Sequence, residues 1–212
     1  MKTNFTQVAS VLLAMLLLCS SCASNYKLLS PEGIYYNAQT EDNGLLFNYK
    51  YDVYALSNNK KYAKKEKRKM LQVVAVKITN NTDRILDTSQ DIRYFIGQQQ
   101  VMPLAPEMVH SQIKQSVPSY LLYLLLFPVQ ITTTSQTNGM EIEQNSFPIG
   151  LILAPGLTIL NMSIAGSANK QMLGDLQRYN LANRKLLPGE TVYGLFGLAN
   201  SGYNPIVAKL AE

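Results

Sequence analysis

The chain of 212 residues is poor in the side chains that perform most protein chemistry, with no tryptophan, one histidine and two cysteines. Acid/base and nucleophilic catalysis near neutral pH leans on histidine, and a transition-metal site needs several His or Cys ligands. The lone His110 follows a proline-rich turn, and no G-x-S-x-G segment accompanies it. We therefore expect His110 to be a surface or loop residue, and we predict no enzyme activity, no cofactor and no metal.

Carboxylates are the remaining candidates for chemistry. Asp83, Asp87 and Asp91 lie near one another, but their spacing matches no calcium loop and lacks the turn glycine. A carboxylate-dependent hydrolase would need two acidic side chains in one cleft. The acidic residues available for such a pair are Glu107, Glu141, Glu143, Asp175 and Glu190.

The N-terminus has the three parts of an export signal. Lys2 gives a basic start, Val8 to Leu18 form an apolar stretch of eleven residues, and small residues follow. A membrane-spanning helix needs about 20 apolar residues, so this stretch is too short for a permanent anchor. We predict that residues 1–21 are a signal peptide that is removed on export.

The next segment, Leu18-Cys19-Ser20-Ser21-Cys22, resembles the lipobox of bacterial lipoproteins. The resemblance covers only the signal region, and Cys19 stands where that family usually has leucine. It implies cleavage before Cys22, lipidation of Cys22, and a membrane partner reached through the lipid anchor. The alternative is ordinary cleavage after Ala23 or Ser24, which gives a soluble secreted domain. In both cases the folded part has no disulfide.

The residues after Cys22 bear on the destination of the anchored protein. No aspartate stands at the next position, and this resembles lipoproteins that are forwarded to an outer membrane. We expect a cell-envelope protein anchored in the outer membrane by lipid and facing the periplasm. For an exported protein, nucleic acid is not an expected partner.

Charged residues make up only 16% of the chain, against about a quarter in average proteins, so membrane or partner is expected to cover part of the surface. The exception is the ten-residue basic decade, residues 60–69 (KKYAKKEKRK). Its basic residues are Lys60, Lys61, Lys64, Lys65, Lys67, Arg68 and Lys69. They form either a solvated hairpin tip or short helix, or a contact for anionic lipid headgroups or an acidic partner.

Period-two alternation predicts strands on both sides of this decade and at the end of the chain. The predicted strands are Leu45 to Leu56, Met70 to Thr79, Ile92 to Ile96, Gln100 to Leu104, Gly189 to Leu198 and Pro205 to Leu210. The first two would form a long hairpin with the basic decade at its tip. We therefore predict a mainly β fold, specifically an antiparallel immunoglobulin-like β-sandwich with an apolar helical insertion.

The middle third contains two apolar runs separated by a polar link. Residues 120–129 are too short to span a bilayer, and residues 147–166 are interrupted by Pro155-Gly156. We expect the runs to be buried against the sheets or to form an exposed apolar hairpin that docks on a membrane or another subunit. The residues proposed for this surface are Tyr120, Leu121, Tyr123, Leu124, Phe127, Leu151, Leu153 and Leu157. Ser167 is predicted to begin a helix that ends at Tyr179.

These observations predict a signal peptide at 1–21, a lipid-anchored tether at 22–32, and one β-sandwich domain at 33–212 with an α-rich apolar insertion at about 107–187. The favoured function is a membrane-anchored envelope lipoprotein with a non-catalytic structural or protein-interaction role, through a protein partner or self-association. A carrier or sensor of an apolar ligand such as a lipid is the second hypothesis, with Leu121 to Phe127 and Leu151 to Leu160 lining a cavity. The carboxylate-dependent hydrolase is the third.

Overall fold

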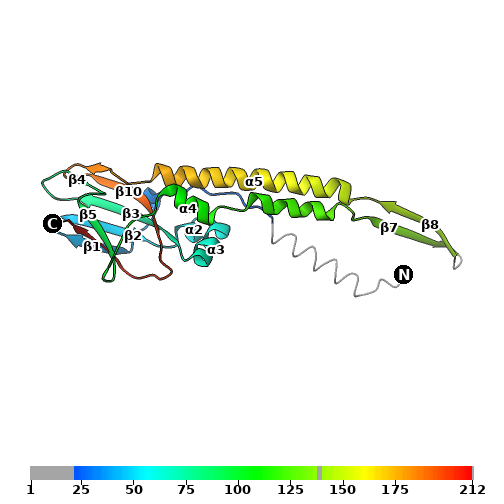
Figure 1. Ribbon diagram of the computed structural model, residues 1–212, viewed down its shortest axis with the longest axis horizontal. Coiled ribbons are helices and arrows are strands. Elements are labelled where there is room, and N and C mark those ends of the chain that lie inside the picture. Colours follow the sequence, from blue (N-terminus) through cyan, green and yellow to red (C-terminus); the bar gives the residue numbers. More distant parts are fainter. Residues whose placement is uncertain (1–21, 138–139, 212) are drawn as a thin grey trace. The chain divides into compact units, whose positions relative to one another are not determined.

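A computed structural model describes residues 22–137 and 140–211 of the chain (Figure 1). The predicted signal peptide, residues 1–21, lies outside the described residues. Backbone contacts divide the described chain into two units. The apolar unit consists of residues 22–25 and 116–167, and the sheet unit consists of residues 26–115 and 168–211. Each unit is considered separately below.

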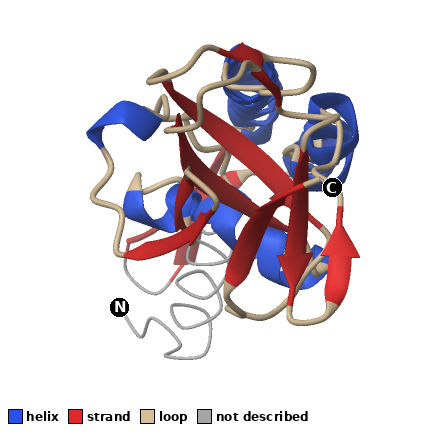
Figure 2. Cartoon of the chain, turned by 90° about the vertical axis from the view of Figure 1, so that its left-hand side faces the viewer, coloured by secondary structure: helices blue, strands red, loops and turns tan. Residues whose placement is uncertain are grey.

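The sheet unit contains antiparallel sheets, seen from one end in Figure 2. A four-stranded sheet has the order β1-β2-β3-β10, and a three-stranded sheet has the order β11-β5-β6. The strands are β1 (Ala38–Asp42), β2 (Leu45–Lys50), β3 (Gln72–Asn80), β5 (Ile92–Ile96), β6 (Gln99–Val101), β10 (Thr191–Leu198) and β11 (Ile206–Leu210). A short pair joins β4 (Leu86–Asp87) to β9 (Lys185–Leu186).

The two larger sheets share one hydrophobic core. Phe47 of β2, Val76 of β3 and Phe196 of β10 pack in one cluster with Tyr94 of β5 and Ile206 of β11. The ring centroids of Tyr94 and Phe196 are 4.9 Å apart with an edge-to-face geometry, an arrangement that aromatic pairs prefer. Side chains alternate along each strand, so these inward positions recur at every second residue.

The four-stranded sheet is also covered on its second face, by helices. Val73 and Ala75 of β3 point to the face opposite Val74 and Val76, and they pack in a cluster with Tyr54, Tyr62 and other side chains. The elements on this side are the 3₁₀ turn η1 (Pro31–Gly33) and the helices α2 (Val53–Leu56), α3 (Lys60–Lys69), α4 (Pro106–Ile113) and the last turns of α5 (Gly150–Arg178). Burial on both faces explains why β3 is almost continuously apolar.

The basic decade does not form the tip of a long hairpin. Strands β2 and β3 pair antiparallel as predicted, but β2 ends at Lys50 and Asp52 has a positive φ of 60°. That left-handed backbone ends the extended segment, and helices α2 and α3 follow. The prediction that Leu45 to Leu56 is one strand is therefore wrong, and the short-helix alternative for residues 60–69 is confirmed.

The apolar unit consists of a helical pair and a β-hairpin. The 3₁₀ helix η2 (Val117–Leu126), drawn in green in Figure 1, leads into β7 (Ile131–Thr137) and β8 (Met140–Phe147), and the chain returns along α5. The predicted polar link is thus a pair of strands. Ser167 is an interior residue of α5, so its predicted role as a helix cap is wrong. Pro155 also lies within this helix and does not end it.

The structure thus confirms antiparallel sheets with apolar helical segments, in a mixed architecture with more helix than predicted. The predicted strands at residues 92–96, near 100–104, and at both C-terminal positions are present. The last two do not pair with each other, because β10 pairs with β3 and β11 pairs with β5.

Candidate functional site

The helical pair of the apolar unit is held together by a close approach of backbones. Gly150 donates its N–H to the carbonyl oxygen of Val129 at 2.9 Å. A Cβ atom at Gly150 would lie 2.1 Å from the carbonyl oxygen of Leu126 and 2.5 Å from that of Phe127. Only glycine fits at this position, so the start of α5 can pack directly on the end of η2.

The buried face of α5 in this unit carries small or polar side chains. Gly150, Ala154, Thr158, Asn161 and Ala165 recur at helical spacing, and all are buried. The Thr158 hydroxyl donates to the Ala154 carbonyl oxygen, and the Asn161 side-chain amide donates to the Leu157 carbonyl oxygen, each at 2.8 Å. The polar groups of this face are therefore satisfied within the unit.

The large apolar side chains of both helices point outward. Exposed fractions reach 74% at Leu125, 67% at Leu122 and 65% at Ile152. The exposed apolar surface consists of Leu121, Leu122, Leu124, Leu125, Phe127, Val129, Leu151, Ile152, Leu153, Ile159 and Leu160. This is the reverse of a water-soluble helix pair, whose large apolar residues face each other.

Most side chains proposed from the sequence for an apolar surface lie on this surface. Leu121, Leu124, Phe127, Leu151 and Leu153 are exposed. Tyr120, Tyr123 and Leu157 are not: the tyrosines are buried, with stacked rings 6.3 Å apart and 3° from parallel, and Leu157 packs partly buried beside them. The tyrosines occupy the inner side of η2 because i, i+3 positions coincide on a 3₁₀ helix.

Cys22 lies against the same helical pair. The hydroxyl of Tyr123 donates to the Sγ atom of Cys22 at 3.7 Å. The backbone N–H of the next residue, Ala23, donates to Oδ1 of Asn161 at 2.5 Å. Cys22, the residue predicted to carry acyl chains, thus contacts η2 through Tyr123, and its neighbour Ala23 binds α5 at Asn161.

Along α5, the exposed side chains change from apolar to polar at Asn161. Between Gly150 and Leu160 every exposed side chain is apolar, whereas Ser163 and Ser167 are exposed beyond Asn161. In the sequence, only Glu141 and Glu143 are charged between Lys114 and Lys170, and both belong to β8. Length and composition alone would allow α5 to cross a membrane, and only 28% of its most apolar window is buried.

The basic residues lie on α3 of the sheet unit. Tyr62 and Glu66 are the buried positions of this helix, and most of its cations are on the opposite, solvated side. Lys65 is half-buried and donates to the Lys114 carbonyl oxygen. Burial, and then Arg68 and the other nearby cations, lower the pKa of Lys65. The cluster is therefore a surface of one charge sign on a regular helix.

Glu66 is the buried carboxyl beneath these cations. Its Oε1 atom accepts a hydrogen bond from the Val73 N–H at 2.6 Å. Burial raises the pKa of Glu66 to about 8, and the hydrogen bond from Val73 opposes this shift. Glu66 therefore joins α3 to the start of β3 and does not neutralise the exposed cations at neutral pH.

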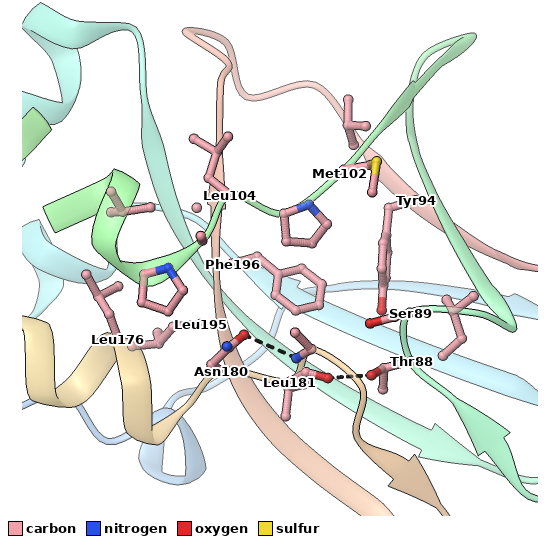
Figure 3. A pocket seen from close by; sticks show the side chains of 18 of the residues that line it. Thr88, Ser89, Tyr94, Met102, Leu104, Leu176, Asn180, Leu181, Leu195 and Phe196 are labelled. Carbon is pink, nitrogen blue, oxygen red and sulfur yellow. Dashed lines mark hydrogen bonds between the residues drawn. The ribbon is translucent and has the colours of Figure 1, made fainter. Parts of the chain in front are cut away.

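A pocket of about 360 Å³ in the sheet unit was not foreseen from the sequence (Figure 3). Its wall includes Tyr94, Met102, Leu104, Leu181 and Phe196. Gly197 forms part of this wall, and a Cβ there would lie 2.2 Å from the Cγ2 atom of Val109. Leu104 donates its N–H to the Gly197 carbonyl oxygen at 2.8 Å, which ties the Pro-rich segment to β10.

Tyr94 gives the pocket an unsatisfied polar group. Its hydroxyl is buried without a hydrogen-bond partner, and Figure 3 shows its ring standing in the wall. Burial raises the pKa of the Tyr94 hydroxyl, so the group stays protonated and can donate. Ligand pockets of this size are typically apolar with a few polar groups. Sequence periodicity identified Tyr94 as a strand residue but contained no sign of the pocket.

Five of the carboxylates considered from the sequence accept structural hydrogen bonds, and Asp83 is exposed. Asp175 accepts from the Leu29 N–H, Glu107 from Gln177, and Glu190 from Arg184. Asp87 and Asp91 accept backbone N–H groups of their own turn. Glu141 and Glu143 lie where side chains are not described. Among the described residues, no three His, Cys, Asp or Glu side chains gather as a metal site would require.

Of the two expected positions for His110, a surface or a loop, the structure gives neither a loop nor full burial: His110 lies on α4 and is half-buried. Burial and the neighbouring Lys114 lower its pKa, and Glu107 opposes them. Comparison of the chain with family models, curated proteins and solved structures gave no match.

Proposed function

We propose that the protein is a non-catalytic envelope lipoprotein whose apolar unit, together with acyl chains on Cys22, anchors the sheet unit at a membrane. The observation that carries the proposal is the contact of Cys22 with Tyr123 and of the next residue, Ala23, with Asn161, on the helical pair that exposes large apolar side chains. Acyl chains at Cys22 would begin beside that surface. The proposed location is the periplasmic face of an outer membrane.

Hydrocarbon fits the exposed apolar surface better than water does. Membrane helices pack through small residues and turn large apolar residues to lipid, and α5 has this arrangement within the apolar unit. An exposed patch of this extent in water favours aggregation unless something covers it. A protein partner or a second copy would then bind the anchored protein elsewhere, for which the sheet unit and its basic helix are available.

Intact-mass analysis of protein extracted from membranes tests the anchor. The mature chain is expected to begin at Cys22 and to carry diacylglyceryl and N-acyl groups. Cys22→Ser should abolish this mass increment and release the chain from the acyl anchor, whereas the control Cys19→Leu, which introduces the residue usual at that lipobox position, should keep it. An unmodified chain beginning at Ser24 or Asn25 would contradict the proposal.

The sheet unit supports a second candidate function, a carrier or sensor of an apolar ligand. The specific observation is the pocket with the unpartnered Tyr94 hydroxyl. This pocket is formed by the sheet unit, not by residues 121–127 and 151–160, where the sequence hypothesis placed a cavity. Binding there is compatible with anchoring by the apolar unit.

For the sheet unit we also propose an immunoglobulin-like sandwich in the broad sense. Two antiparallel sheets over one core, with β10 and β11 in different sheets, support this classification. The tryptophan and cysteine landmarks of antibody domains are missing from the chain after residue 22. A crystal structure with another strand order would remove this classification.

A further inference from the structure

We propose that the helical pair of the apolar unit, η2 with the first part of α5, crosses the hydrocarbon layer and places the β7–β8 hairpin on the opposite side of the membrane from the sheet unit. This inference rests on the proposed anchor and extends it. The occupant of the exposed apolar surface is then the hydrocarbon of the bilayer.

The first argument is that the helical pair has no polar side. In residues 120–129 and 150–160, all of them described, no exposed side chain is polar. On η2, Leu121, Leu124 and Phe127 form one outward ridge and Leu122 and Leu125 form another. A helix that lies in the membrane surface keeps a polar face toward water. An apolar surface on all outward sides instead fits a segment that lipid surrounds.

The second argument is length. At 1.5 Å per residue, α5 rises about 17 Å from Gly150 to Asn161. Before Gly150, Ile149 and Leu151 donate their backbone N–H groups to the carbonyl oxygens of Phe147 and Pro148, so this segment turns into the helix and adds only a little to its length. The 3₁₀ helix η2 covers about 20 Å in ten residues, at about 2 Å per residue. The apolar band from Phe147 to Asn161 is thus about 20 Å long, which is shorter than the ~30 Å core of an average bilayer, so the crossing requires a thinner membrane or local thinning of the lipid.

The third argument is the polarity at the two ends of this band. At one end lies Asn161, which accepts the backbone N–H of Ala23, and acyl chains on the preceding Cys22 would hold this end at the membrane interface. Ser163 and Ser167 follow on α5 beyond this level. At the other end, Gln130 is exposed, and the exposed polar pair Thr132 and Ser146 follows the first rung of the β-hairpin, which Ile131 and Phe147 form. Both boundaries of the band are therefore marked by a change of residue type.

The fourth argument concerns the hairpin itself. Strands β7 and β8 pair with each other in a two-stranded sheet, so their outer edges have unpaired N–H and C=O groups. Hydrocarbon does not accept such edges. The strands are rich in Thr, Ser and Gln, and β8 contains Glu141 and Glu143. The hairpin therefore belongs in water, and it lies at the end of the apolar band remote from Cys22.

The sequence had argued against a spanning pair, and two structural facts change that conclusion. Pro155 does not interrupt α5. The first run is a 3₁₀ helix, which is longer per residue than an α-helix. Prolines are tolerated in membrane helices where neighbouring groups satisfy the freed carbonyl.

Cysteine labelling of intact cells tests the sidedness. Acylated Cys22 carries no reactive thiol, so Thr137→Cys in β7 and Lys185→Cys in β9 each introduce one reactive thiol into the mature full-length chain. A membrane-impermeant maleimide should label Thr137→Cys in intact cells and Lys185→Cys only after the outer membrane is permeabilised. Labelling of both after permeabilisation, confirmed for each variant, shows that both thiols are reactive.

Labelling of both positions in intact cells, or of both only after permeabilisation, would overturn the crossing and favour burial of the apolar surface by a protein partner or a second copy. Labelling of Lys185→Cys alone in intact cells would support the crossing with the sheet unit outside. Intact-mass analysis of the same samples reports lipidation of Cys22 independently, so failure of the crossing is distinguishable from failure of the anchor.

Discussion

The hydroxyl of Tyr123 and the Sγ atom of Cys22 lie 3.7 Å apart, in hydrogen-bonding contact. This contact connects the residue proposed to carry lipid with the buried side of a helix whose outer side is apolar. Tyrosine is enriched at membrane interfaces because its ring is apolar and its hydroxyl is polar. The pair therefore marks the level at which the apolar unit is expected to enter the membrane.

The contact between Gly150 and η2 predicts a sharp difference between two glycines of one helix. Gly150→Ala should lower the free energy of unfolding by about 1–3 kcal/mol, because its Cβ would overlap the Leu126 carbonyl oxygen. Gly156→Ala is the control, with nothing within 4 Å of a Cβ, and should stabilise α5 by about 0.5–1 kcal/mol. Melting temperatures in detergent measure both. Equal shifts for the two variants would disprove the close packing.

Glu66 predicts a loss of stability as pH rises. An acid whose pKa is higher in the folded protein binds its proton more tightly there, so its contribution is complete below its unfolded pKa of about 4.3. That contribution is lost as pH rises through the folded pKa of about 8. Glu66→Gln should therefore stabilise the protein by several kcal/mol at pH 9, at about 1.4 kcal/mol per pKa unit, and by only about 1 kcal/mol at pH 5.

The measurement for Glu66 is thermal unfolding of both proteins between pH 5 and pH 9. Glutamine can still accept the hydrogen bond from Val73, so the comparison isolates the charge. Glu41→Gln, at an exposed position of β1, is the matched control and should leave the pH profile of the wild type unchanged. Parallel profiles for wild type and Glu66→Gln would show that Glu66 is not the titrating group.

The pocket predicts binding of a small neutral molecule with an apolar chain. Because the chain has no tryptophan, Met102→Trp at the pocket rim provides a single fluorophore that octan-2-one should quench saturably. The control is Tyr203→Trp, at an exposed position elsewhere on the sheet unit, whose fluorescence measures quenching by random collision with octan-2-one. Equal quenching of the two reporters would dismiss the site.

The basic helix predicts attraction to anionic lipid. Reversal of Lys64, Lys67 and Arg68 to glutamate should reduce binding of the unlipidated Cys22→Ser chain to phosphatidylglycerol vesicles more than 100-fold at low salt, at about 1 kcal/mol for each lost cation. Reversal of Lys50, Lys77 and Lys185 is the control with the same net charge. If both triple variants lose equal affinity, net charge and not the α3 cluster explains the binding.

Much of the sheet unit was predictable from residue pattern. Alternation located β5 and β11, because each buries one face against a core, and the apolar residues of β10 located that strand although both its faces are buried. Alternation failed at residues 51–56. Val53 continues the apolar period of the strand, but Val53 and the next residue, Tyr54, pack in the cluster on the helical side of the sheet. The left-handed backbone at Asp52 produces this change, and no period in the sequence reports it.

The apolar unit was less predictable, for identifiable reasons. The β7–β8 hairpin had a signal in Asn138-Gly139, a dipeptide typical of tight hairpin turns, and in the β-branched threonines before it. Because the segment is polar overall, it was predicted to be a link and not a pair of strands. Whether Leu122 or Tyr123 faces inward could not be inferred, because the choice depends on a 3₁₀ periodicity that a run of leucines does not reveal. The pocket depends on Gly197 and Leu104, which are distant in sequence.

Quenching by brominated lipid tests the central claim, that the exposed apolar side chains of this protein contact hydrocarbon. Ile152→Trp, at an exposed position of α5 inside the apolar band, supplies a single tryptophan in a chain that otherwise has none, and Tyr203→Trp in the sheet unit is the control variant. In bilayers of acyl-brominated phospholipid, Ile152→Trp should emit at short wavelength and lose most of its intensity, while Tyr203→Trp should keep its intensity. An unquenched Ile152→Trp in lipid-reconstituted protein would contradict the account.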